Sequence, residues 1–233
     1  MSGPREERPA RGRWTAPAIV ELKRRGEPVA VVTAYDFPTA RLADEAGVEI
    51  VLVGDSLGTV VLGHESTLPV TMADMLHHVR AVTRARPAAL VVADMPFLSF
   101  QTGVEDAVRN AGRFVQEAGA DAVKLEGGER VAAAVRRIVE AGIPVMGHLG
   151  LTPQSVLVFG GYRVQGRAEA DRERLLREAR LLEDCGCFAV VLEGIPASLG
   201  AAVSRRGACR SSCGATPTWR GPCATPSPAT WPT

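Results

Sequence analysis

The chain has 233 residues, of which 46% are hydrophobic, 23% are charged and 5% are aromatic. This balance is typical of an ordinary globular domain and excludes a disordered chain. The formal net charge of +1 gives no electrostatic signal for nucleic-acid binding. A chain of this length buries enough surface to fold without a disulfide framework or a structural metal.

The cysteines and the first residues predict a cytoplasmic protein. The five cysteines form no CxxC pair and no zinc-like spacing with histidine, which favours a reducing compartment. Residues 1–14 lack the apolar stretch of a signal peptide, and no apolar run approaches the roughly 20 residues that span a bilayer. Glu6, Glu7 and two prolines in this Arg-rich start favour a flexible N-terminus over a transit peptide.

From Pro28 to Glu193, short apolar runs alternate with longer segments of helical period. This alternation predicts βα units around a parallel sheet, whose strands are continuously apolar because both faces are buried. The predicted strands are Val29–Thr33, Ile50–Val53, Leu90–Ala93, Ala122–Leu125, Pro144–Gly147 and Phe188–Leu192.

The segments between the strands carry apolar stripes at helical spacing. Thr71 and Asp74 form a capping box at the start of one helix, and Gly119 and Gly142 predict the ends of two others. The predicted stripes are Met72, Met75, Leu76, Val79 and Val82; Val104, Ala107, Val108, Ala111 and Val115; Val131, Val135, Ile138 and Val139; and Leu175, Leu176, Ala179 and Leu182.

A polar or ionisable residue stands at or just after the end of every predicted strand. These residues are Asp36, Asp55, Asp94, Lys124 with Glu126, His148 and Glu193. A barrel gathers the carboxyl ends of its strands around one mouth, whereas an open sheet spreads them along a line. The pattern therefore favours a (β/α)₈ barrel of the TIM type over residues 15–206.

Asp55, Asp94 and Glu126 place three carboxylates at three strand ends. A single carboxylate in this position is more typically a helix cap, but three together are a hard-oxygen set that suits Mg²⁺. The trio predicts a magnesium site.

Lys124 and Glu126 lie two apart on one strand, so both side chains point to the same face. They form either a structural ion pair or a site at which Lys124 binds an anionic group of a substrate. Glu193 follows an apolar strand, where burial could raise its pKa and make it a general base, although a loop anchor is an equally common role. His148 in such a position is more typically a packing residue than a catalyst.

Several motifs are absent. Gly58 and Gly63 have phosphate-loop spacing, but His64 and Glu65 follow instead of Lys and Ser or Thr, and neither GxGxxG nor GxSxG occurs at the expected places. What remains is metal-assisted acid–base chemistry. This set of groups would suit enolate formation from a 2-oxo acid, with Lys124 on the carboxylate and Glu193 taking the proton.

Five long strings of the sequence are distinctive. They are VGDSLG at 53–58, GHESTLPVT at 63–71, KLEGG at 124–128, GHLGLTPQS at 147–155 and FGGYRVQGR at 159–167. In these strings the chain closely resembles the ketopantoate hydroxymethyltransferase family of pantothenate and coenzyme A biosynthesis. The likeness covers about Thr15 to Ser204.

The resemblance implies a (β/α)₈ barrel that uses Mg²⁺ and 5,10-methylenetetrahydrofolate to convert 3-methyl-2-oxobutanoate into 2-dehydropantoate. It also implies a large, ring-based homo-oligomer of decamer type. Matched position by position, the metal ligands would be Asp55, Asp94 and Glu126, the substrate-binding residues Asp55, Ser56, Asp94 and Lys124, and the proton acceptor Glu193.

Residues 207–233 depart from the family. They contain no Leu, Ile, Val, Met, Phe, Asp, Glu or Lys, and no strand or helix stripe is visible in them. The family would continue with two more βα units, so the barrel is expected to lack its last two units. A reading-frame shift would explain this composition, and re-reading the nucleotides for an apolar continuation in another frame tests that hypothesis.

Two alternatives to the transferase stay open. One is a related metal-dependent lyase or mutase that acts on pyruvate-like acids, since it would share the metal and the enolate. The other is an inactive truncated product of the transferase gene, whose remaining role would be to associate with intact subunits.

Overall fold

The structure is a computed structural model that describes residues 12–205 and 212–213. Seven strands form one parallel sheet, and their order in the sheet is their order in the chain. The strands are β1 (Val31–Thr33), β2 (Ile50–Val53), β3 (Leu90–Asp94), β4 (Ala122–Glu126), β5 (Val145–Gly150), β6 (Ala189–Glu193) and β7 (Ser212–Cys213).

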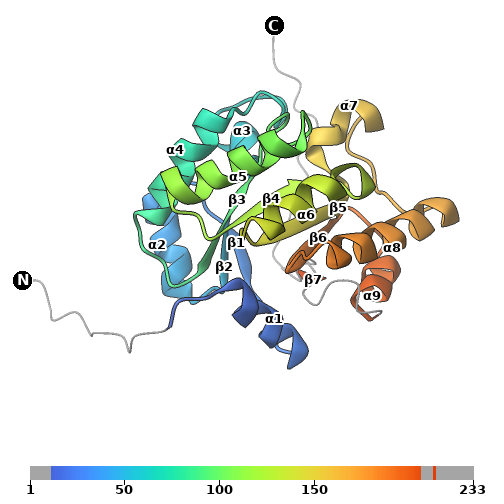
Figure 1. Ribbon diagram of the computed structural model, residues 1–233, viewed down its shortest axis with the longest axis horizontal. Coiled ribbons are helices and arrows are strands. Elements are labelled where there is room, and N and C mark those ends of the chain that lie inside the picture. Colours follow the sequence, from blue (N-terminus) through green and yellow to red (C-terminus); the bar gives the residue numbers. More distant parts are fainter. Residues whose placement is uncertain (1–11, 206–211, 214–233) are drawn as a thin grey trace, which may run out of the picture.

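Helices connect the first six strands, as parallel neighbours require. The helices are α1 (Ala16–Arg24), α2 (Phe37–Ala46), α3 (Leu57–Val60), α4 (Met72–Thr83), α5 (Val104–Ala118), α6 (Ala132–Glu140), α7 (Val156–Phe159), α8 (Glu169–Asp184) and α9 (Ala197–Arg205). In Figure 1, α4, α5, α6 and α8 lie in front of the strands, and α1 lies apart from this layer at the lower edge. None of the helices in the described ranges is both long and apolar enough to cross a membrane.

The sheet packs differently on its two faces because side chains alternate along each strand. On the outer face, Val51, Val91 and Val123 join one buried cluster with the inner stripes of the covering helices. On the inner face, Ile50, Leu90, Val92, Ala122 and Met146 form a second cluster with α1, which contributes Ile19 and Leu22. The inner face is thus covered by α1 at one end of the strands, and the polar strand ends lie at the other end.

The predicted parallel α/β architecture is confirmed, with all six predicted strands present. The β2 strand has the predicted bounds, β1 begins at Val31 instead of Val29, and β3, β4, β5 and β6 each run on to include the polar residue at their end. These strands extend because their last residues still pair with a neighbour, as Glu126 does with His148 and Gly150 with Glu193. The run of apolar residues therefore ends one to three residues before the hydrogen-bonded pairing of these strands ends.

The capping box of α4 and the glycine end of α5 are confirmed. The Thr71 hydroxyl accepts from the Asp74 backbone, the Asp74 carboxylate accepts from the Thr71 backbone, and Gly119 adopts the left-handed conformation after α5. The predicted stripe of α5 is wrong at its end, because Phe114 is fully buried while Val115 is 37% exposed. The larger aromatic side chain of Phe114 occupies the core-facing position, so the buried stripe ends one residue earlier than predicted.

Two predictions concern parts of the chain that are hardly described. The predicted flexible N-terminus, residues 1–14, lies mostly outside the described residues, and so does the departing segment 207–233. Within that segment no strand was expected, yet the backbone of β7 pairs in parallel with Val190 and Val191 of β6. Of the five cysteines, Cys185 and Cys187 have described side chains, and both are buried.

Candidate active site

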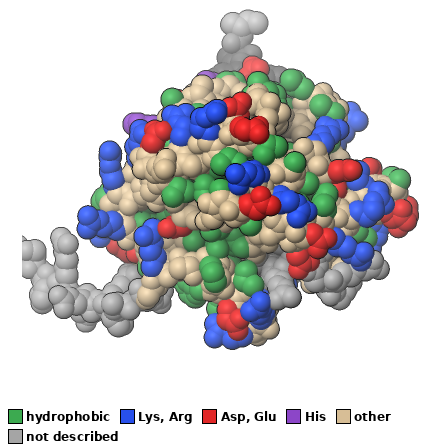
Figure 2. Space-filling view, in the orientation of Figure 1, with side chains coloured by type: hydrophobic (Ala, Val, Ile, Leu, Met, Phe, Trp, Pro, Cys, Tyr) green, Lys and Arg blue, Asp and Glu red, His purple; other side chains and the backbone are tan. Residues whose placement is uncertain are grey.

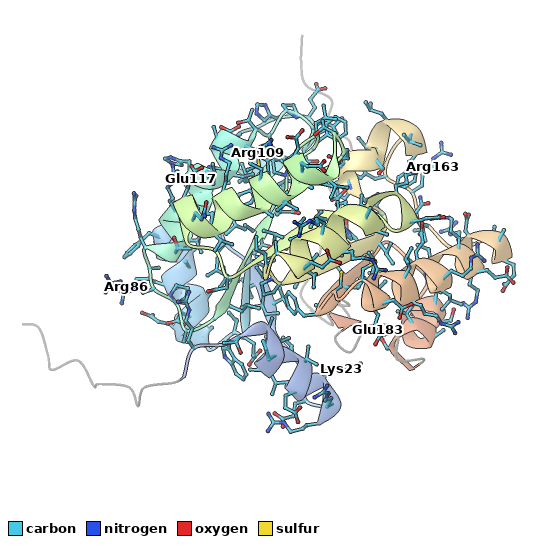
Figure 3. The ribbon with its side chains drawn as sticks, viewed as in Figure 1. Lys23, Arg86, Arg109, Glu117, Arg163 and Glu183 are labelled. Carbon is cyan, nitrogen blue, oxygen red and sulfur yellow. The ribbon has the colours of Figure 1, made fainter. Side chains whose placement is uncertain are left out.

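The predicted site residues lie on the inner face of the sheet at the carboxyl ends of its strands. Because side chains alternate along a strand, the inner face is apolar near the start of each strand and charged near its end. It changes from Val92 to Asp94 on β3 and from Ala122 to Lys124 and Glu126 on β4. On β5 and β6 the same alternation places His148 and Glu193 on this face. The charged residues of the covering helices lie on the periphery instead, including Arg109 and Glu117 of α5 (Figure 3).

Lys124 is the centre of the site. Its Nζ donates to Asp94 Oδ2 at 2.6 Å and lies 3.9 Å from Glu126 Oε1, and all three side chains are at most 5% exposed. The backbone N–H of Asp55, which follows β2, donates to the same Asp94 oxygen at 3.3 Å. The residues at the ends of β2, β3 and β4 are therefore in direct contact, as the sequence predicted for a shared mouth.

Burial and mutual repulsion raise the pKa values of two of the carboxyls. Burial raises the pKa of Asp55 to about 7, with a further contribution from the negative charge of Asp94, while Lys124 and a hydrogen bond from Gln154 oppose the shift. Burial likewise raises the pKa of Asp94, against the opposing effect of Lys124. Burial by itself would lower the pKa of Lys124, but Asp94, Glu126 and Asp55 outweigh it and raise the pKa, so Lys124 is charged.

The donor set fits a divalent cation, although its side chains are held by other partners in this structure. Asp94 Oδ1 is buried and has no hydrogen-bond partner, which leaves a carboxylate oxygen available in a site with excess negative charge. Within the described part of the chain, no three His, Cys, Asp or Glu side chains are already gathered as a ligand group. The predicted ligands Asp55, Asp94 and Glu126 thus share one site, where Lys124 and Gln154 contact their oxygens.

His148 lies between two carboxylates at the ends of β4 and β6. It is 2% exposed, with Nδ1 3.4 Å from Glu126 Oε1 and Nε2 3.2 Å from Glu193 Oε2. Neither contact has hydrogen-bond geometry. Burial and Lys124 lower the pKa of His148, but the two carboxylates outweigh them and raise it. In turn, burial raises the pKa of Glu126, and His148 and Lys124 outweigh that effect and lower it.

The predicted proton acceptor Glu193 is more accessible than its apolar strand suggested. Its side chain is 47% exposed, whereas the other charged groups of the site are buried. The strand becomes more exposed along its length, from buried Ala189 and Val190 to exposed Glu193. Among the described residues, the expected apolar enclosure of this carboxylate is not formed, and its Oε2 instead lies 3.2 Å from His148 Nε2.

Ser56 and Asp36 have different roles, although both follow strands. Ser56 follows Asp55 in the chain, and its hydroxyl shares a 2.9 Å hydrogen bond with the hydroxyl of Tyr35. Asp36 caps α2, since its carboxylate accepts from the backbone and the hydroxyl of Thr39. Asp36 is thus a structural cap at an exposed position and does not belong to the charged cluster.

Gln154 is a site residue that sequence reasoning missed. It lies in a short 3₁₀ turn, Pro153–Ser155, after β5, and its side chain donates to Asp55 Oδ2 at 2.9 Å. A cavity of about 660 Å³ opens beside it, lined among others by Glu126, Leu149 and Phe159. Neither charge nor periodicity marks a glutamine in a loop, and the one signal in the sequence is that Gln154 lies in the string 147–155 that carries the family resemblance.

Comparison with known proteins gives one consistent result. A profile of the ketopantoate hydroxymethyltransferase family matches residues 13–219. The 3-methyl-2-oxobutanoate hydroxymethyltransferase of Moorella thermoacetica is 62% identical over 189 residues, which are 81% of this chain and 70% of that protein. The enzyme of the same name from Syntrophus aciditrophicus is 58% identical over 191 residues, covering 82% of this chain and 70% of that one.

Among solved structures, the chain is similar to 2,3-dimethylmalate lyase, a member of the PEP mutase/isocitrate lyase superfamily. The TM-score is 0.59 at 19% identity, with 82% of this chain and 67% of that chain covered. At this identity the likeness shows a shared parallel α/β fold. The family is decided by the profile match and by the much higher identity to the named transferases. The chain is therefore an enzyme of the ketopantoate hydroxymethyltransferase family.

Proposed function

We propose that this chain transfers a hydroxymethyl group from 5,10-methylenetetrahydrofolate to 3-methyl-2-oxobutanoate, giving 2-dehydropantoate. The observation that carries the proposal is the buried Lys124 among Asp55, Asp94 and Glu126 on the inner face of the sheet. The names of the two bacterial relatives support this substrate. The described fold would then be six units of a (β/α)₈ barrel, and the family's ring-like homo-oligomer is the assembly we expect.

The roles of the residues follow from their charges and burial. Lys124 stays protonated, so its ammonium can hold the carboxylate of the 2-oxo acid. Ser56, next to Asp55, can donate a hydrogen bond to the same substrate. Glu193 is the proposed acceptor of the C3 proton, since its carboxylate is accessible to a substrate. The carbon freed of its proton would then form a C–C bond with the one-carbon unit, which gives up its two bonds to the folate nitrogens, and a water molecule would supply the hydroxyl oxygen of the product.

Asp55, Asp94 and Glu126 are the residues that would hold Mg²⁺. When bound, the cation would polarise the keto oxygen of the substrate and so acidify its C3 proton. The unpartnered Asp94 oxygen supports a cation at this place.

Exchange of the C3 proton of 3-methyl-2-oxobutanoate into heavy water, without folate, tests the proposal. We expect Mg²⁺-dependent exchange that is lost in Glu193→Gln. The control Glu140→Gln removes a carboxylate that is 57% exposed on α6 and should leave exchange unchanged. Exchange that persists in Glu193→Gln would contradict the role of Glu193.

The same assay separates the alternatives. Exchange without hydroxymethyl transfer when folate is added would favour a lyase or mutase of pyruvate-like acids, for which the shared fold with 2,3-dimethylmalate lyase is the supporting observation. Folded protein with no exchange at all would favour an inactive product.

A further inference from the structure

We infer that Gln154 is a positioning residue that holds Asp55 and Glu126 in the arrangement required for a divalent cation, and that Gln101 orients it. The inference rests on the proposed function, because it concerns the same cation site. It is carried by four hydrogen bonds of Gln154, three of its side-chain amide and one of its backbone N–H.

Gln154 contacts two of the three carboxylates from one turn. Its Nε2 donates to Asp55 Oδ2 at 2.9 Å, and its backbone N–H donates to Glu126 Oε2 at 2.9 Å. Gln154 is 6% exposed, so water does not compete for these bonds. Asp55 follows β2 and Glu126 ends β4, and this single residue therefore ties the two sides of the site together.

The orientation of the amide is fixed by its other two contacts. Nε2 also donates to the carbonyl oxygen of Met95 at 2.9 Å, so both of its protons have acceptors. Oε1 accepts from Nε2 of Gln101 at 3.1 Å. Rotating the amide by 180° would bring its oxygen against a carboxylate and a carbonyl oxygen, and all three bonds would be lost.

This arrangement demands glutamine for a chemical reason. A glutamate would place a second carboxylate against Asp55, and an apolar side chain would leave Asp55 Oδ2 without its donor. Groups that orient the ligands of a metal typically change its affinity by about 10–100-fold when they are removed. The side chain of Gln154 occupies such a place relative to Asp55.

Binding of Mn²⁺, followed by the paramagnetic resonance signal of the free ion, tests the inference without any turnover. Mn²⁺ takes the same carboxylate ligands as Mg²⁺. Gln154→Met keeps the side-chain length and the backbone bond to Glu126, and we expect it to weaken Mn²⁺ binding by about 10-fold or more. The control Gln116→Met makes the same change at an exposed position of α5 and should bind as the unmodified chain does.

Gln101→Ala provides the second test, at an exposed position, because the Gln101 amide nitrogen donates to Gln154 while its oxygen contacts only the neighbouring backbone N–H of Phe100. We expect Gln101→Ala to weaken binding less than Gln154→Met does, and to have no added effect in the double variant. Independent roles of the two residues would give additive losses. If Gln154→Met fails to fold, Gln101→Ala decides the question by itself.

The outcomes are distinguishable. Folded variants that bind Mn²⁺ as tightly as the unmodified chain would overturn the role of Gln154 and leave the proposed function standing. Additive losses in the double variant would overturn the orienting role of Gln101. An unmodified, folded chain that binds no Mn²⁺ would overturn both the inference and the proposed cation site.

Discussion

The carboxyl of Asp55 makes the stability of this protein depend on pH. Its folded-state pKa of about 7 lies above the ordinary value of 3.8, so the folded chain binds this proton more tightly than the unfolded chain does. The contribution to the free energy of unfolding is full below the unfolded-state pKa and is lost as the pH rises through the folded-state pKa. Asp94 and His148 act in the same direction, because their pKa values are raised as well, whereas the lowered pKa of Glu126 acts in the opposite direction.

We therefore predict that the cation-free protein becomes less stable between about pH 4 and pH 7, and that Asp55→Asn flattens this slope. Urea unfolding across that range measures the effect. Mg²⁺ should restore stability at the upper end of the range, because it binds the charged carboxylates. An unchanged slope in Asp55→Asn would mean that another group causes the pH dependence.

At the scale of elements, the join between β5 and β6 positions Glu193. Gly150 ends β5 with φ +94°, and a Cβ there would lie 2.2 Å from the carbonyl oxygen of Glu193. This close approach allows the Leu151 N–H to donate to that same oxygen at 2.8 Å. Only glycine can adopt this positive φ without strain and leave room for the carbonyl oxygen of Glu193.

Gly150→Ala should destabilise the protein more than Gly142→Ala, and it should also slow C3 proton exchange by displacing Glu193. Gly142 is the matched control, since it has φ +88° but no atom within 4 Å of the position that a Cβ would take. Its substitution should cost about 1–2 kcal/mol for backbone strain alone. Urea unfolding and the exchange assay measure the two effects, and equal losses in both variants would argue against the close contact.

At the scale of the whole molecule, the sheet is unevenly protected. In the part of the chain that the structure describes, β1 pairs with β2 alone and Val32 is 41% exposed, while β3 and β4 are buried throughout and paired on both sides. Acidic and basic side chains are interspersed on the face shown in Figure 2, as the small net charge suggests. Within the described residues, the free edge of β1 has unpaired backbone groups that can form hydrogen bonds with a further strand.

Hydrogen exchange followed by mass spectrometry should find the amides of β1 exchanging well before those of β3 and β4. The reason is that opening one edge strand breaks a single ladder, whereas opening a central strand disrupts the core. Peptides from α5 and α6, which pack on the central strands, are the internal reference. Equal protection of β1 and β4 would indicate that another segment or another copy of the chain covers this edge.

The sequence by itself determined the strands, the capping box of α4 and the shared face of Lys124 and Glu126. These features follow from short-range periodicity, because alternation along a strand fixes which side chains share a face. Ser56 was found only through the family resemblance, since a serine after a strand has no distinctive chemistry.

The tertiary structure alone decided how the charged residues are held. Gln154 reaches Asp55 across 99 positions of sequence, and His148 meets Glu193 only because β5 and β6 are neighbours. It also left the Glu193 side chain half exposed where an apolar strand suggested burial. Contacts between distant segments depend on how the strand ends converge, and no local pattern of residues encodes that geometry.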